Sequence, residues 1–277
     1  MVRARLAEMD QLSPGRGAVG GSYWNERGRA RRFSAALDAT AEKDPLYARL
    51  RRASDRRSTV VDVGAGTGRF SMALAPRVTD VVAVDPSTAM LGILRRSARR
   101  QGVGNVRTVE SRWEDAPLAP DPDGVPTADV VFCSFVLPLI AEAEAFVAKM
   151  DATCRGRAFV YLNASSGDAL TEHFWRHFHG RPRRPAPTYL DLQAILGDLG
   201  LRPEVEVVEL PTRARFDTLA AAVKAYREVL VLPDTAEVRK EMRGLLSSWL
   251  VEDRGALRPP VRTMPAAIVS WPASRAR

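Results

Sequence analysis

Short runs of apolar, mostly β-branched residues alternate with segments of helical periodicity between residues 59 and 162. Five of these runs have the length of a strand: 59–63, 81–84, 106–109, 130–133 and 158–162. Between them, apolar residues recur every three or four positions, as in 90–98 and 143–150, which is the spacing of one helix face. Continuous apolar strands that alternate with helices are typical of a parallel sheet covered on both faces. The pattern therefore predicts an α/β fold with a doubly wound sheet.

The segment before this alternation has a different character. Residues 1–22 are aperiodic, and a helical pattern then runs from Trp24 to about Arg52. Pro45 should break that helix, because proline lacks the N–H that a helix interior requires. We expect a flexible tail followed by helices that cover the sheet.

Beyond residue 163 the strand and helix patterns no longer alternate regularly. The pattern predicts a helix over 189–199, a sixth strand over 204–210, two amphipathic helices and a last strand over 264–271. The second amphipathic helix should begin at Asp234, with Glu237 completing a capping box. We therefore divide the chain into a flexible tail (1–22), an N-terminal helical lid (23–56), a cofactor-binding core (57–163), an acceptor loop with a helix and strand six (164–210), a helical insertion (211–256), and the last strand with a tail (257–277).

Charge and composition argue against several classes of protein. Lys and Arg number 41 against 33 Asp and Glu, a net charge of +8, yet the arginines are scattered and aromatic residues are not interleaved with them. A nucleic-acid partner is therefore not expected. Cys133 and Cys154 cannot form a disulfide scaffold, and the charge-free run 130–141 is too short to span a bilayer. The start of the chain has no apolar signal core, so we expect a cytoplasmic protein without a membrane segment. We also expect it to be a monomer or a homodimer.

A glycine-rich segment directly follows the first predicted strand and opens a helix. It contains Asp62 and then Gly64, Ala65, Gly66 and Gly68. Glycines allow the chain to turn sharply and let a ligand approach the backbone where a Cβ would obstruct it. The spacing is G-x-G-x-G with an acid two positions earlier, which differs from the G-x-G-x-x-G of dinucleotide-binding enzymes. A nicotinamide-dependent oxidoreductase is therefore disfavoured.

This segment resembles the first motif of the class I S-adenosylmethionine-dependent methyltransferases, and the resemblance covers about residues 58–162. It implies a Rossmann-like, mostly parallel seven-stranded sheet whose last strand is antiparallel, with N-terminal helices and a helical insertion before that strand. It also implies S-adenosyl-L-methionine as cofactor. By the resemblance, the glycine loop lies under the methionyl part and ribose of the cofactor, and Asp62 contacts its aminoacyl end.

Asp85 ends the second predicted strand, about 20 residues after the loop. A carboxylate at that position can accept hydrogen bonds from both ribose hydroxyls. The methyltransferase resemblance also places Met90 or Ser87 near the adenosine, and it includes Pro86 among the cofactor-binding residues.

Further cofactor contacts follow from the resemblance alone. Trp113 would form a stacking or hydrophobic wall for adenine, and Glu114 would offer a carboxylate, although the position that is usually acidic in the family aligns with Arg112 here. After the fourth strand, Ser134 and Phe135 would line the cofactor pocket.

Three histidines lie together after the fifth strand. His173 and His177 are four residues apart, hence on one helix face, and are the candidate catalytic base. Two alternatives stay open: a structural or surface role, and a metal pair, for which no third ligand is identifiable. Four aromatic residues are assigned to the acceptor site or its lid: Tyr23, Trp24, Trp175 and His179.

The predicted activity is methyl transfer to a small-molecule acceptor. The alternatives are RNA or protein methylation and a catalytically silent cofactor-binding scaffold subunit. Against amino-group methylation of nucleic acids, the chain lacks the Asn/Asp-Pro-Pro-aromatic signature after the fourth strand, where it reads Cys-Ser-Phe-Val. Cys133 also lacks the Pro-Cys context of a cytosine-C5 nucleophile, so it is interpreted as a buried strand residue.

Overall fold

The computed structural model describes residues 41–121, 123–165 and 168–274. The predictions for the tail at 1–22, for the start of the helical lid and for Tyr23 and Trp24 lie outside the described residues.

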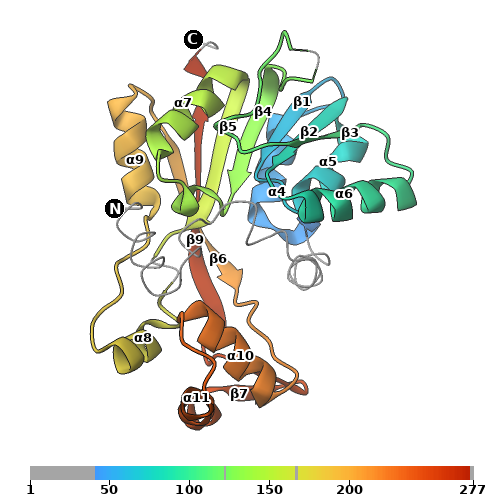
Figure 1. Cartoon of the computed structure of the whole chain (residues 1–277). Coiled ribbons are helices and arrows are strands. Elements are labelled where there is room, and N and C mark those ends of the chain that lie inside the picture. The colour runs from blue at the N-terminus through green and yellow to red at the C-terminus, as the bar shows by residue number, and fades with distance from the viewer. Residues whose placement is uncertain (1–40, 122, 166–167, 275–277) are drawn as a thin grey trace.

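A seven-stranded sheet in the order β3-β2-β1-β4-β5-β9-β6 forms the centre of the molecule (Figure 1). Strand β9 runs antiparallel to its neighbours β5 and β6, whereas the other pairs are parallel. The predicted doubly wound sheet with an antiparallel last strand is therefore confirmed. Its strands are β1 (Thr59–Val63), β2 (Asp80–Asp85), β3 (Val106–Glu110), β4 (Ala128–Ser134), β5 (Cys154–Asn163), β6 (Glu204–Pro211) and β9 (Thr263–Pro272).

Helices cover both faces of this sheet. Alternate residues of each strand point to opposite faces, so Val60 and Val61 belong to two different hydrophobic clusters. One face carries α4 (Pro45–Ala53), α5 (Arg69–Leu74) and α6 (Thr88–Arg100), and the other carries α7 (Ala143–Thr153) and α9 (Tyr189–Asp198). Short 3-10 helices are η1 (Ala41–Lys43), η2 (Ala75–Arg77) and η3 (Leu137–Leu139).

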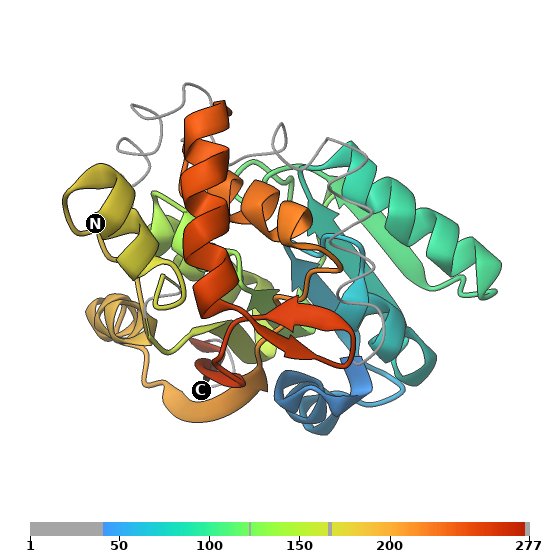
Figure 2. The ribbon, with the colours of Figure 1, turned by 90° about the horizontal axis from the view of Figure 1, so that it is seen from below.

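A separate helical lobe lies beyond one end of the sheet (Figure 1). It consists of α8 (Glu172–His179), α10 (Leu219–Val229), α11 (Ala236–Trp249) and a hairpin of β7 (Val251–Asp253) and β8 (Ala256–Arg258). Figure 2 shows α11 lying across α10. The lobe has its own hydrophobic core, built from all three helices, with Phe174, Met242 and Leu246 among its buried side chains.

The predicted break at Pro45 is present: η1 ends at Lys43, Asp44 is extended and caps α4, and Pro45 occupies the first turn of α4, where its missing N–H costs nothing. One local prediction was wrong. Helix α11 is capped by Thr235, whose hydroxyl accepts from Val238 N at 3.3 Å, and not by Asp234. The Asp234 carboxylate instead forms ion pairs with Arg227 of α10 and Arg239 of α11, and these ion pairs hold it in place.

The β7–β8 hairpin was not predicted. Its strands have three residues each and are joined by Arg254 and Gly255, which both adopt positive φ values of 52° and 73°. Strands this short carry too few positions for an alternating pattern to be recognised.

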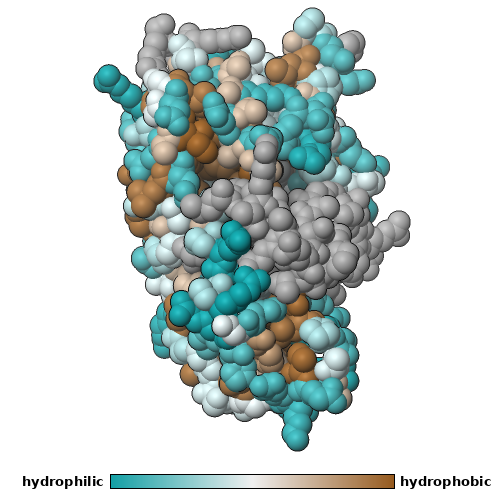
Figure 3. Space-filling view, turned by 60° about the vertical axis from the view of Figure 1, so that its left-hand side comes forward, coloured by the Kyte–Doolittle hydropathy of each residue, from teal (hydrophilic) through white to brown (hydrophobic). Residues whose placement is uncertain are grey.

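Among the described residues on the face drawn in Figure 3, hydrophilic residues surround smaller groups of hydrophobic ones. Across the described ranges, none of the helices combines the length and the apolar character that a membrane crossing demands.

The lobe core gives a first prediction. Leu246→Ala should lower the free energy of unfolding by about 2 to 5 kcal/mol, because Leu246 is fully buried and its truncation leaves a cavity. Lys240→Ala, on the exposed side of the same helix, should change it by less than about 0.5 kcal/mol. Urea unfolding followed by tryptophan fluorescence measures both, and equal stabilities of the two variants would contradict the packing described.

Candidate functional site

The glycine loop connects β1 to α5 in a left-handed backbone conformation. Gly64, Gly66 and Gly68 have φ values of 73°, 55° and 82°. A Cβ at Gly64 would lie 2.3 Å from Val136 Cγ2, and one at Gly68 would lie 2.2 Å from Leu94 Cδ1. A Cβ at Gly66 would meet none of the described residues within 4 Å. Two of the glycines therefore permit close packing, whereas a Cβ at Gly66 would obstruct none of the described residues.

Asp85 holds this loop against the end of β2. Its Oδ2 accepts from Gly66 N at 2.9 Å and its Oδ1 accepts from Ser87 N at 2.8 Å. Burial raises the pKa of Asp85, and the two backbone donors oppose that shift. The carboxylate is therefore fixed, with one donor on each oxygen.

Asp62 lies at the end of β1 and is 3% exposed. Its Oδ2 accepts from Ser71 Oγ at 2.6 Å. Burial raises the pKa of Asp62 to about 7. The group is thus poised between its neutral and ionised forms near neutral pH, and a nearby cation would favour the ionised form.

Two cavities meet at the glycine loop, and Gly64 lines both. The larger has a volume of about 560 Å³ and the smaller about 120 Å³. The larger cavity is lined by Asp62, Gly64–Thr67, Arg69, Phe70, Ser134, Phe135, Asn163, Leu170, Leu210–Ala214 and Met264. The smaller cavity is lined by Val63, Gly64, Val84–Pro86, Arg112–Glu114, Val136, Leu139, Ile140 and Phe146.

Trp113 forms a fixed wall of the smaller cavity. The residue is 3% exposed, and its indole Nε1 donates to Phe146 O at 3.1 Å. The Lys149 ammonium lies 5.1 Å from the ring centroid on a cation–π contact. Beside it, Glu114 accepts from Arg112 at 3.1 Å. This cavity therefore combines a rigid aromatic wall with the carboxylates of Asp85 and Glu114.

Ser134 and Phe135 lie on the larger cavity at the end of β4. Phe135 adopts a φ of 58°, and its N–H donates to Tyr161 O at 2.7 Å. Its ring packs at a tilt against the Tyr161 ring, with 4.8 Å between the centroids. Cys133, directly before them, is fully buried, and burial raises the pKa of its thiol to about 12. The thiol is therefore inert at neutral pH, in keeping with its interpretation as a buried strand residue.

Most of the predicted cofactor residues line one of the two cavities: Asp62, Gly64, Ala65, Gly66, Asp85, Pro86, Trp113, Glu114, Ser134 and Phe135. Gly68 and Met90 do not. Gly68 caps α5, and Met90 is buried in the first turn of α6, where its N–H donates to Ser87 Oγ. Their positions support the loop rather than the cavity wall.

The histidine segment lies in the lobe, and none of its three histidines is among the residues that line either cavity. The His173 ring packs at a tilt against Trp249, with 5.1 Å between the centroids, and burial lowers the pKa of His173. His177 Nε2 lies 2.7 Å from Glu241 Oε1, and His179 Nε2 lies 2.9 Å from Leu230 O. The catalytic role predicted for His173 and His177 stays a prediction that these contacts do not support.

Trp175 is also placed in the lobe core. It is fully buried between the Arg183 guanidinium, 4.5 Å from its ring, and the His179 ring at 4.0 Å. The lid or acceptor role predicted for Trp175 and His179 therefore lacks support from the cavity lining.

Several lining residues were not predicted, among them Arg69, Asn163, Leu170 and Arg213. Strand β6 runs parallel to β5, since both are antiparallel to β9. Carboxyl ends of parallel strands meet at one sheet edge, where ligands of open α/β sheets bind. That rule, applied to the residues that follow strands five and six, would have identified Asn163 and Arg213.

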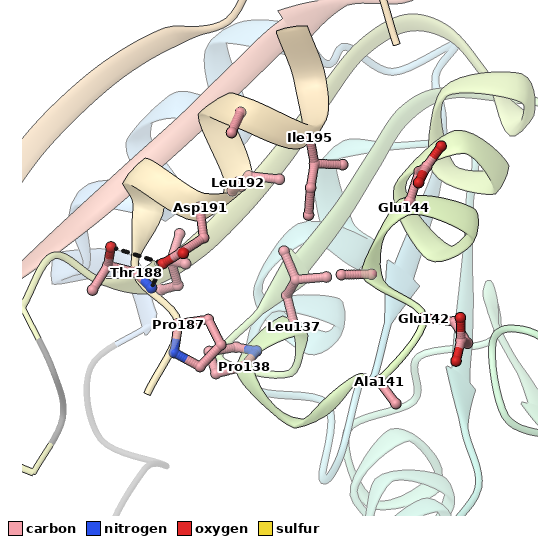
Figure 4. A pocket seen from close by; sticks show the side chains of 13 residues that line it. Leu137, Pro138, Ala141, Glu142, Glu144, Pro187, Thr188, Asp191, Leu192 and Ile195 are labelled. Carbon is pink, nitrogen blue, oxygen red and sulfur yellow. Dashed lines mark hydrogen bonds between the residues drawn. The ribbon is translucent and has the colours of Figure 1, made fainter. Parts of the chain in front are cut away.

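A third hollow lies between η3, the start of α7 and the start of α9 (Figure 4). Its volume is about 430 Å³, and among the described residues it shares no lining residue with the two cavities at the glycine loop. The Asp191 carboxylate drawn there accepts from Thr188 N at 2.7 Å, and the two residues form the capping box of α9. Asp191 thus serves a helix terminus, while Glu142 and Glu144 also line this hollow. The cavities at the glycine loop, which the predicted cofactor residues line, form the candidate site.

Comparisons with known proteins agree with this assignment. Residues 60–156 match the family model described as a methyltransferase domain. An uncharacterised protein of Haemophilus influenzae is 29% identical over 150 residues, which is 54% of this chain and 53% of that protein. An uncharacterised methyltransferase of Bacillus subtilis, YcgJ, is 25% identical over 129 residues, 46% of this chain and 49% of the relative. The chain thus spans about half the length of the curated relatives it matches.

A solved structure extends the likeness over nearly the whole chain. It is the magnesium protoporphyrin IX methyltransferase of Synechocystis PCC 6803 with bound SAH (S-adenosylhomocysteine). The TM-score between the two structures is 0.56. The match covers 92% of this chain and 97% of that chain at 16% identity, so it shows a shared fold.

Asp62 gives a prediction on pH. With a pKa of about 7 in the folded state and about 3.8 otherwise, it binds more protons when folded between about pH 4 and pH 7. Its contribution to stability therefore falls as the pH rises through that window. Asp62→Asn removes this dependence. From pH 4.5 to pH 8 the free energy of unfolding of the variant should therefore rise by a few kcal/mol relative to that of the wild type, at about 1.4 kcal/mol per pH unit.

Urea unfolding at several pH values measures this effect. Asp115→Asn is the control, because the Asp115 side chain is 73% exposed and should leave the pH profile as it is in the wild type. Parallel profiles for the wild type and Asp62→Asn would show that Asp62 ionises as an ordinary exposed carboxyl does.

Proposed function

We propose that this chain, which carries a class I S-adenosylmethionine-dependent methyltransferase domain, transfers the methyl group of S-adenosylmethionine to a small-molecule acceptor. The predicted family agrees with the matched methyltransferase domain, and the fold shared with a methyltransferase that was solved with SAH bound supports the predicted cofactor. The acceptor class is the part that we propose here.

The larger cavity is the observation that carries this proposal. Its volume of about 560 Å³ lies within the range of roughly 300 to 1,000 Å³ that is usual for small-molecule sites. Its lining is mostly apolar and includes Phe70, Phe135, Leu170 and Met264. It adjoins the glycine loop through Gly64, so an acceptor held there lies next to the cofactor loop. The Synechocystis neighbour is named for a small-molecule substrate, which supports the same acceptor class.

The residues around the smaller cavity fit the adenosyl part of the cofactor. Each Asp85 oxygen already accepts one backbone N–H and retains a second lone pair, which suits the two hydroxyls of a ribose. Trp113 offers a flat apolar wall and Glu114 a carboxylate. Gly66, where a Cβ would meet no residue of the described ranges, leaves the loop backbone accessible to a ligand from that side.

The aminoacyl end of the cofactor would lie on the side of the loop that faces the larger cavity, held by Asp62, Ser134 and Phe135. Asp62 suits a cationic group, because its raised pKa returns toward the ordinary value beside a positive charge. When bound, S-adenosylmethionine supplies a methyl group activated by the positive sulfur. The chain then has to align the acceptor with that methyl group and exclude water, for which a mostly apolar cavity is suited.

Cofactor binding gives the first functional prediction. SAH should raise the Tm of the wild type, since a ligand that binds only the folded state stabilises it. Asp85→Asn should weaken SAH binding by about ten- to a hundredfold, through loss of charge-assisted hydrogen bonds worth roughly 1.5 to 3 kcal/mol. The matched control Asp115→Asn, whose side chain is exposed, should bind SAH as the wild type does.

Isothermal titration calorimetry measures all three affinities, and circular dichroism checks that Asp85→Asn is folded. Absence of any SAH binding by the wild type would overturn the proposed function. The reverse order of the two variants would mean that the acidic residues have been assigned to the wrong roles.

The histidines give a second prediction. His173 packs on Trp249 within the lobe, so His173→Ala should lower the Tm, leave SAH affinity unchanged and reduce turnover less than tenfold. His177→Ala, which loses a partly exposed pair with Glu241, should have smaller effects on all three. Turnover is measured with a labelled methyl donor and the acceptor found by screening metabolites. A loss of about a hundredfold in either variant would instead support the general base predicted from the sequence.

A further inference from the structure

Two arginines on the wall of the larger cavity share one aspartate. Arg69 is the first residue of α5, and Arg213 follows the end of β6. Arg69 Nη2 lies 2.9 Å from Asp44 Oδ2, and Arg213 Nη2 lies 3.6 Å from the same oxygen. The other oxygen of Asp44 accepts from Leu46 N at 3.0 Å, which caps α4. Two guanidinium groups against one carboxylate leave this group with a net positive charge.

This charge is largely removed from water. The side chains of Asp44 and Arg69 are 1% and 9% exposed, and that of Arg213 is 35% exposed. Burial and the neighbouring Arg69 lower the pKa of Arg213, while Asp44 opposes this shift. Arg213 is therefore the more accessible of the two cations, in a place where an anion would be stabilising.

Hydrogen-bonding groups at the same wall are left without partners. Within the described part of the chain, buried Arg69 Nε has no hydrogen-bond partner, and neither do the hydroxyls of Thr67 and Thr212. All three residues line the larger cavity. A buried polar atom without a partner is unfavourable, and a bound hydrogen-bond acceptor would relieve that cost. The wall thus offers both charge and donors.

The rest of the cavity shows what kind of molecule would carry that acceptor atom. Its lining away from the arginines is mostly apolar, with Phe135, Leu210 and Met264 among its side chains. Asp62 is the acid of this lining, and burial raises its pKa to about 7. A ligand with an apolar body and one anionic group would therefore complement both parts of the cavity.

We propose that the acceptor carries a carboxylate or a phosphate group on an apolar body, and that Arg213 and Arg69 bind this group. Planar guanidinium groups match the geometry of carboxylate and phosphate oxygens. Asp44 orients the two arginines, so it is a positioning residue. The inference rests on the proposed function, because it assigns the substrate class of the same cavity. The competing source of an anion is the carboxylate of the cofactor itself.

The experiment compares the wild type with Arg213→Gln, Arg213→Lys and the matched control Arg215→Gln. Arg215 lies two residues further along, is 44% exposed and pairs with Asp253 outside the cavity. Arg213→Gln should fold, because Asp44 keeps its closer partner Arg69. The Tm of each variant checks this.

Benzoate, phenyl phosphate and neutral benzamide are the probes, titrated by calorimetry with and without saturating SAH. The wild type and Arg215→Gln should bind benzoate or phenyl phosphate at least tenfold more tightly than benzamide. Arg213→Gln should reduce this preference below twofold, with Arg213→Lys between the two. The affinity for SAH should stay within twofold in all four proteins.

Two results would overturn the inference. One is an anion preference that is absent in the wild type or survives in Arg213→Gln. The other is a tenfold or greater loss of SAH affinity in Arg213→Gln, which would assign the arginines to the cofactor carboxylate. A wild type that fails to bind SAH contradicts the proposed function instead, and the titration without SAH still measures the anion preference.

Discussion

The carboxylate of Asp85 ties the glycine loop to the neighbouring strand, and the site depends on that contact. Strands β1 and β2 are parallel neighbours, so the loop after β1 and the end of β2 lie at the same edge of the sheet. Asp85 joins them by accepting from Gly66 and Ser87 at once. Because both donors are backbone groups, the position of the loop is fixed without a further side chain. Gly64, which lines both cavities, is held by a separate backbone contact, in which its N–H donates to Val84 O at 2.8 Å.

The larger cavity is assembled at that edge from segments that are distant in sequence. The loop after β1, the end of β4 and the residues after β5 and β6 all reach it. The antiparallel direction of β9 brings its beginning, at Met264, to the edge where the parallel strands end. The chain between β6 and β9 forms most of the lobe, and this connection places Arg213 on the cavity wall.

Charge is distributed unequally between the two cavities. The smaller one presents the carboxylates of Asp85 and Glu114, with Arg112 paired to Glu114. The larger one presents two arginines and the buried Asp62. Hydroxyl donors of a nucleoside suit the first environment, and an anionic acceptor suits the second. Electrostatics in buried sites is strong because few water molecules screen it, so this asymmetry would orient two ligands about the loop.

The sequence by itself determined the order of the elements and the cofactor loop. Strands 59–63 and 204–210 were predicted to within a residue, because continuous apolar runs and glycine spacing are local features of the chain. Only the tertiary structure decided which side chains share a cavity. Arg69 and Arg213 are 144 positions apart and meet at Asp44 through the packing of α4 against the sheet. In the same way, the histidines looked catalytic by residue type and spacing, yet the packing of α8 on α10 and α11 places them in the lobe. Local patterns carry no information about such contacts, because they depend on which distant surfaces bury one another.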